Sequence, residues 1–157
     1  MQEIFLSVFF AENYIAMKTN WIQTIWTTNK CQELISREID IIIYEFLKSE
    51  FNLMGCEVKV INGTSDHVHC LFNFNSKRSL DEIIKMVKGA SSHRINQGGL
   101  VKDKFAWEKG YECCSVGKSE MEEEIQKILK QKSIHSDLSI TIEDEINQMH
   151  EYETDEV

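Results

Sequence analysis

The pattern of apolar and polar residues along the chain predicts four β-strands. Each segment is rich in aromatic and β-branched residues or alternates between apolar and polar positions with a period of two. The predicted strands fall at residues 21–28, 57–61, 67–74 and 111–116. The step Asn62-Gly63 is a turn signal, so we expect the second and third strands to form a hairpin.

Apolar residues recur at helical spacing between and after these strands. Helices are predicted at residues 31–51, 79–96, 118–132 and 138–152. Ser79 and Glu82 form a capping box, which marks the start of the second helix. The order β-α-β-β-α-β, followed by helices, predicts an α+β fold of the split βαβ, ferredoxin-like type. We expect one antiparallel sheet with two helices on one face, the other face being left open for a site or a partner.

The third predicted strand carries two histidines, two residues apart. Because strand side chains alternate between faces, His67 and His69 share one side with Leu71, and Val68 and Cys70 point to the core. Two imidazoles at this spacing can share one divalent ion. Asp66, directly before them, is placed to orient a ring. The alternative is a pair of half-exposed histidines without a ligand.

Composition narrows the class of protein. The 157 residues suit a single domain, and no apolar run approaches the roughly 20 residues that span a bilayer. Five cysteines without disulfide-like spacing, and an N-terminus without signal-peptide features, predict a cytoplasmic protein. The net charge of −9 comes from residues 112–157, because residues 1–111 carry 13 basic and 13 acidic residues. Residues 77–109 are locally basic, which is typical of a phosphate-binding surface or of a solvated helix face.

Five blocks of the sequence resemble the single-tyrosine HUH transposases of small insertion sequences, including the REP-associated ones. They occur in the family's order between Trp21 and His135 and include WIQTIWTTNK, INGTSDHVHCLF, SLDEIIKMVKGASSHRIN and FAWEKGYECCSVGKSE. The resemblance implies a homodimer that binds hairpin ends and cuts and rejoins single-stranded DNA through a phosphotyrosine. It also implies that His67, His69 and Gln131 hold Mg²⁺ or Mn²⁺, with Asp66 behind them.

The family's nucleophile is absent from its expected place. The Tyr-Ile-x-x-Gln motif of the family, laid without a gap on the third predicted helix, places Ile128 and Gln131 correctly but puts Lys127 at the tyrosine. Helical spacing predicts that Lys127 and Gln131 point together, opposite an apolar stripe that includes Leu129. An ammonium has no lone pair with which to attack a phosphate. We therefore expect strand transfer to be lost or impaired, with Tyr152 as the only substitute nucleophile, and then only if the tail folds back.

The resemblance also suggests a DNA surface and domain limits. The DNA-binding candidates are the cationic and hydroxyl side chains Lys85, Lys88, Ser91, Ser92, Arg94, Lys102 and Lys104. Phe105 and Trp107 suit base stacking or core packing, and Glu108 replaces a usual glutamine. We divide the chain into an N-terminal extension (1–16), the transposase-like domain (17–136) and an acidic tail (137–157) that competes with DNA. The alternatives to an enzyme are a non-enzymatic DNA-binding or ligand-sensing module and a degraded gene copy.

Overall fold

A computed structural model describes residues 19–74, 77–138 and 140–151. Its sheet contains β1 (Trp21–Thr27), β2 (Glu57–Gly63), β3 (His67–Asn73) and β4 (Glu112–Ser115). All pairings are antiparallel and the spatial order is β2-β3-β1-β4. This order, with a helix after β1 and another after β3, confirms the split βαβ, ferredoxin-like prediction. Strand bounds agree with the sequence pattern to within two residues because the period-two signal is local.

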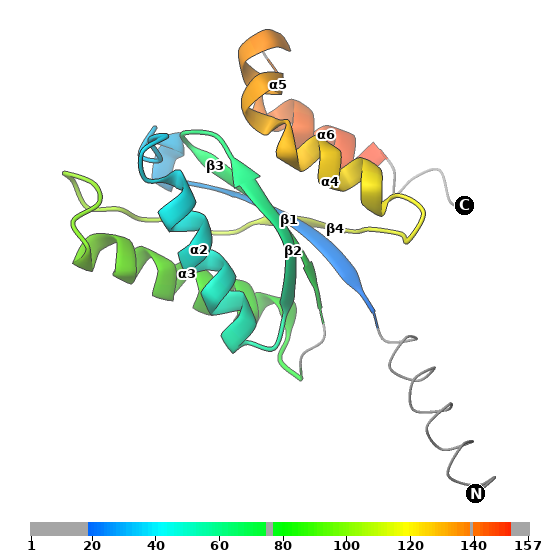
Figure 1. Ribbon diagram of the computed structural model, residues 1–157, viewed down its shortest axis with the longest axis horizontal. Coiled ribbons are helices and arrows are strands. Elements are labelled where there is room, and N and C mark those ends of the chain that lie inside the picture. The colour runs from blue at the N-terminus through cyan, green and yellow to red at the C-terminus, as the bar shows by residue number, and fades with distance from the viewer. Residues whose placement is uncertain (1–18, 75–76, 139, 152–157) are drawn as a thin grey trace, which may run out of the picture.

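Two helices cover one face of the sheet (Figure 1). They are α2 (Asp40–Leu53) and α3 (Leu80–Gln97), and they enclose the main core with the inward residues of the strands. Val68, Cys70 and Phe72 of β3 are fully buried there, as their alternation predicts. The capping box at the start of α3 is present, because Ser79 Oγ accepts from Glu82 N and the Glu82 carboxylate accepts from Ser79 N.

The opposite face is not open, contrary to the sequence-based expectation. It is covered by α4 (Met121–Leu129), α5 (Gln131–Leu138) and α6 (Ile142–Glu151), all on the side away from α2 and α3 (Figure 1). Leu71 of β3 and Val116 pack there with Ile128 of α4 in a second apolar cluster. The single helix predicted over 118–132 is divided at Lys130, where α4 ends and α5 begins. The chain's own C-terminal helices therefore form a third layer.

The first predicted helix begins later than its periodicity suggests. Residues 29–31 form a short 3₁₀ turn, η1 (Asn29–Cys31), with a positive φ at Lys30, and α2 starts only at Asp40. Backbone bonds tie the chain on both sides of η1 to the loop before β3: Thr28 N donates to Asp66 O at 2.7 Å, and Ile35 N donates to Ser65 O at 2.9 Å. The bond of Ile35 satisfies a backbone donor that a helix would otherwise satisfy.

The Asn62-Gly63 step is not the hairpin turn that the sequence suggests. Both residues belong to the end of β2, and Gly63 pairs with Val68. A Cβ on Gly63 would lie 2.1 Å from the backbone oxygen of His67, so glycine is required by close strand approach. The Asn62 side chain instead donates to the carbonyls of Ile128 at 2.9 Å and Leu129 at 3.1 Å. The step therefore anchors the end of α4 to the sheet.

In the part of the chain that the structure describes, no helix is both long enough and apolar enough to cross a membrane. The five cysteines, all within the described residues, form no disulfide, and Cys56 and Cys70 are buried. Burial raises the pKa of the Cys70 thiol well above its usual value, so Cys70 behaves as an apolar core residue.

Candidate metal centre

His67 and His69 stand side by side on β3, under the C-terminal helices. Their side chains point to the same face because they are two residues apart in a strand. The rings meet edge to face, with centroids 5.3 Å apart. They are 1% and 2% exposed, so the half-exposed alternative does not describe them. Burial of two imidazoles requires polar partners.

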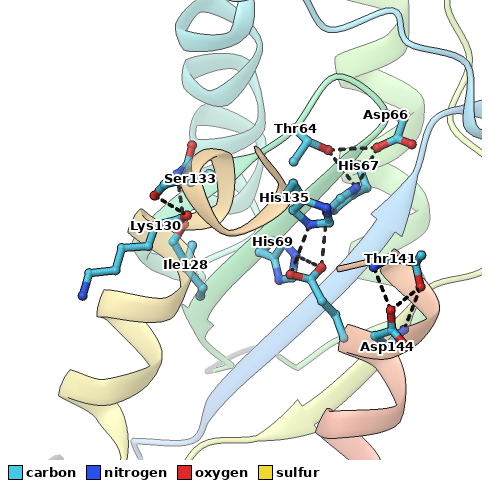
Figure 2. A network of polar contacts seen from close by, with 12 residues as sticks. Thr64, Asp66, His67, His69, Ile128, Lys130, Ser133, His135, Thr141 and Asp144 are labelled. Atoms are coloured by element: carbon cyan, nitrogen blue, oxygen red, sulfur yellow. Dashed lines mark hydrogen bonds and ion pairs between the residues drawn. The ribbon is translucent and has the colours of Figure 1, made fainter. Parts of the chain in front are cut away.

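His67 is held through its Nδ1 atom. This nitrogen lies 2.7 Å from Asp66 Oδ1 and 2.8 Å from Thr64 Oγ1, so Asp66 contacts the ring that it was expected to orient (Figure 2). Burial favours the neutral ring, but the carboxylates of Asp66 and Glu145 outweigh it and raise the pKa of His67 to about 9. The Nε2 atom faces the interior of the site and makes no hydrogen bond, although it is buried.

His69 is held more deeply and by a neutral partner. Its Nδ1 lies 3.3 Å from Gln23 Nε2, and its Nε2 lies 3.1 Å from Glu145 Oε2. Burial lowers the pKa of His69, which favours a neutral, ligating imidazole. Gln23 Oε1 is buried without a partner. Exchanging the amide oxygen and nitrogen of Gln23 would let His69 donate from Nδ1 and leave Nε2 free to bind an ion.

Glu145 of α6, which was not among the predicted site residues, lies between the two histidines. Its Oε2 is 3.4 Å from His67 Nε2 and 3.1 Å from His69 Nε2, and the residue is 8% exposed. Burial raises its pKa, but the close contacts of its carboxylate with the ring nitrogens of His67 and His69 lower the pKa more, so it stays well below its usual range. Glu145 is therefore an anion enclosed among imidazoles.

His135 of α5 reaches the same place and was also missed. Its Nε2 lies 3.2 Å from Glu145 Oε1, and its ring centroid is 4.8 Å from that of His67. The three imidazoles converge in Figure 2 from β3 and from α5. Gln131, the first residue of α5, is buried nearby, and its side chain hydrogen-bonds the Glu145 carboxylate. The Oε1 atom of Gln131 has no hydrogen-bond partner.

The donor atoms suit a divalent cation. One ligand atom each from His67, His69 and Glu145 lies within 4.8 Å of the others. Among the buried polar atoms of the site, His67 Nε2, His135 Nε2 and Gln131 Oε1 lack hydrogen bonds, which is the condition expected of atoms that face an ion. The expected metal set of His67, His69 and Gln131 is thus gathered in one buried place, together with two residues that were not expected.

Comparison with known proteins identifies the family to which this chain belongs. A family profile described as "Transposase IS200 like" matches residues 16–132, about three-quarters of the chain. The chain belongs to the IS200-like transposase family. No curated protein sequence gives a significant match.

Solved structures of transposases share the fold. A candidate transposase from Deinococcus radiodurans R1 has a TM-score of 0.57 and 20% identity, covering 70% of this chain and 88% of that one. A REP-associated tyrosine transposase bound to a REP hairpin has a TM-score of 0.56 and 11% identity, covering 75% of this chain and 68% of that one. At these identities the likeness is one of fold.

In this member of the IS200-like transposase family, Lys127 does not share a face with Gln131, contrary to the expectation from helical spacing. The break at Lys130 turns Gln131 into the buried site, whereas the Lys127 side chain is half-exposed. Lys127 Nζ lies 3.0 Å from both Glu123 Oε1 and Glu124 Oε1. Leu129 also leaves the expected apolar stripe and is exposed. Lys127 is thus an ion-paired ammonium.

The residues expected to bind DNA lie around α3, on the face of the sheet opposite the histidines (Figure 1). Several are already engaged: Lys88 Nζ donates to the backbone oxygens of Glu108 and Gly110, and Ser91 Oγ accepts from Trp107 Nε1 at 2.9 Å. Arg94 pairs with Glu50 at 3.1 Å. Exposed cations remain at Lys85, Lys102 and Lys104.

Trp107 and Phe105 belong to the core rather than to a stacking surface. Both are buried, and their rings pack edge to face with centroids 4.7 Å apart. The Glu108 carboxylate accepts from the backbone N–H of Lys30 at 2.9 Å and from that of Lys109 at 3.0 Å. A cleft of about 450 Å³ lies between α3 and this segment, and Lys85 and Ser92 are among its lining residues.

Proposed function

We propose that this chain binds hairpin single-stranded DNA and a divalent cation as a member of the IS200-like transposase family, but has lost phosphotyrosine strand transfer. The observation that carries the metal part is the buried, unbonded Nε2 of His67 beside His69 and Gln131. The loss of chemistry rests on Lys127, which stands where the family places its tyrosine. Mg²⁺ and Mn²⁺ are the ions implied by the family resemblance.

Each residue has a defined part in this proposal. A bound divalent ion would neutralise charge on the scissile phosphate. His67 and His69 would offer Nε2 to the ion, and Asp66 would fix the ring of His67 through Nδ1. Lys127 contributes a cation to the surface but no nucleophile, because its ammonium is bound by two carboxylates.

The remaining described tyrosines do not replace the missing one. Tyr44 is in α2 and packs against the main core, and burial raises the pKa of its hydroxyl. Tyr111 donates to Asp81 Oδ1 at 2.6 Å beside α3, on the other face of the sheet. Tyr152 lies outside the described residues. A non-enzymatic binding module is therefore the second candidate, and the ion pairs of Lys127 favour it.

The DNA part of the proposal rests on the family and on the exposed cations around α3. A relative of the same fold carries a REP hairpin. Lys85, Lys102 and Lys104 would neutralise phosphates, so affinity should fall with salt. The family resemblance also implies that the protein is a homodimer. Analytical ultracentrifugation tests that part, and a monomer throughout the micromolar range contradicts it.

A covalent-adduct gel tests the chemistry. Native protein and a Lys127→Tyr variant are each mixed with labelled hairpin DNA and Mn²⁺ and then denatured. Each of these two proteins is also tested with the added substitution Glu145→Ala, because the Glu145 carboxylate lies against the histidines. We expect no adduct without the tyrosine and an adduct in Lys127→Tyr with Glu145→Ala. An adduct of the native protein would disprove the loss of strand transfer.

A binding measurement tests the metal and DNA parts separately. Hairpin affinity is measured with and without Mn²⁺ for Glu145→Ala and for the double variant Glu145→Ala with His69→Ala, because Glu145 lies against the histidines. We expect Mn²⁺ to strengthen binding by Glu145→Ala only, because an ion held by the histidines offsets phosphate charge. Lys102→Ala should instead weaken binding with and without the ion. Equal affinity of the two variants in all four conditions would contradict the metal site.

A further inference from the structure

Two residues that follow the family-matched region reach into the histidine pair. The family profile ends at residue 132, whereas His135 and Glu145 lie beyond it on α5 and α6. We propose that these two residues complete a closed, zinc-type site with His67 and His69, which leaves no coordination position for a DNA phosphate. This inference rests on the proposed metal role of the histidine pair.

The distances agree with tetrahedral coordination. Zinc bonds of about 2.0–2.1 Å to nitrogen and oxygen place neighbouring ligand atoms roughly 3.3 Å apart in a tetrahedron. Glu145 Oε2 lies 3.4 Å from His67 Nε2 and 3.1 Å from His69 Nε2. His135 Nε2 lies 3.2 Å from the other oxygen of the same carboxylate. The contacts of His67 and His69 with Glu145 Oε2 therefore already have the spacing that a shared ion imposes. His135 contacts the other oxygen of Glu145, so its ring moves toward the shared point when it binds the ion.

The surrounding residues orient the donors as the partners of metal ligands do. Asp66 and Thr64 bind His67 at Nδ1, which directs its Nε2 into the site. Gln23 faces His69 Nδ1, and Gln131 hydrogen-bonds Glu145. Histidine ligands usually have their second ring nitrogen held in this way. In this arrangement Gln131 positions the carboxylate and is not itself a ligand.

The donor types select the class of ion. Three imidazole nitrogens and one carboxylate oxygen favour zinc and neighbouring transition metals, whereas Mg²⁺ requires oxygen donors and retains waters. Four protein ligands are typical of closed structural zinc sites, and catalytic sites keep one position open. Glu145 fills the position that a phosphate oxygen would need, and its charge repels a phosphate. The site would then fasten α5 and α6 to the sheet.

The same contacts would also occur if these side chains only hydrogen-bonded to one another without an ion, so the test must measure metal binding directly. Zn²⁺ and Mg²⁺ affinities of the full chain are measured by competition with a chromophoric chelator. Glu145→Ala and His135→Ala are compared with Glu143→Ala, which removes an exposed carboxylate from the same helix. Glu145→Gln keeps the shape of the side chain, and circular dichroism confirms the fold of each variant.

We expect tight Zn²⁺ binding and weak Mg²⁺ binding. Glu145→Ala and His135→Ala should each weaken Zn²⁺ binding by at least about 10- to 100-fold, since loss of an orienting partner alone costs that much. Glu143→Ala should be unchanged. With Mn²⁺ present, Glu145→Ala should also bind hairpin DNA more tightly than the native protein does.

His69→Ala separates the two proposals. If it abolishes Zn²⁺ binding while Glu145→Ala and His135→Ala bind like the native protein, the closed site is wrong and the proposed family-type metal site stands. If His69→Ala binds Zn²⁺ like the native protein, both fail. Mg²⁺ binding that is as tight as Zn²⁺ binding would also overturn the closed site.

Discussion

The docking of the C-terminal layer can be tested with two adjacent residues. Ile128 is fully buried between Leu71 and Val116, and its neighbour Leu129 is 53% exposed. Ile128→Ala removes three carbons from the second apolar cluster. At about 0.8 kcal/mol per buried carbon the transfer loss is about 2.4 kcal/mol. A cavity adds to this, so we expect a loss of about 2–5 kcal/mol in the free energy of unfolding.

The matched control is Leu129→Ala, which removes the same number of carbons from the same turn. Because half of that side chain is already in water, we expect a loss below about 1 kcal/mol. Urea unfolding followed by circular dichroism measures both midpoints, with equal slopes required for comparison. Equal losses at the two positions would refute the register of α4 on the sheet, and with it the placement of α5 and α6.

Three further predictions follow from other contacts. Asn62→Ala leaves two carbonyls at the end of α4 without their donor and should lower the free energy of unfolding by about 1–3 kcal/mol, measured by urea unfolding. Trp107→Phe keeps most of the apolar ring but removes the bond to Ser91 Oγ, and should lower it by about 1–2 kcal/mol in the same assay; an unchanged midpoint would contradict that bond. The pKa of His67 is raised from 6.5 to about 9, so its stabilising effect is complete below pH 6.5 and is lost as the pH rises through 9. In metal-free buffer the free energy of unfolding should therefore fall by on the order of 3 kcal/mol over that interval, which urea unfolding measures as a lower midpoint. His67→Ala should abolish this fall.

The sheet could be predicted from the sequence because its signal is local. Period-two alternation places Val68 and His67 on opposite faces without knowledge of any distant residue, and the structure agrees. The predicted start of the first helix was wrong because long-range backbone bonds outweigh the local periodicity there. Ile35 is buried as its pattern requires, yet its N–H donates to the carbonyl of Ser65. Likewise Gly63 is explained by the backbone of His67, a contact between strands that a turn dipeptide does not indicate.

The candidate site also has one part that local sequence predicts and one part that depends on distant residues. The histidine pair is visible from two adjacent strand positions, but its contact with Glu145 spans 76 residues, which no spacing rule connects. A weaker signal was present. Ile142, Glu145 and Met149 lie at helical spacing on one side of α6, so Glu145 interrupts the apolar face of an amphipathic helix. A carboxylate there is either paired or bound to an ion when the helix docks.

Taken together, the two proposals give strand transfer two independent blocks. Lys127 of α4 would leave the reaction without a nucleophile, and Glu145 of α6 would take the place of a phosphate oxygen. If both proposals hold, Lys127→Tyr alone should form no DNA adduct, Glu145→Ala alone should form none, and the double variant should form one. Such non-additivity is expected when each change removes a separate requirement of one reaction. An adduct of equal yield in Lys127→Tyr with and without Glu145 would refute the closed site and leave the missing tyrosine as the sole block.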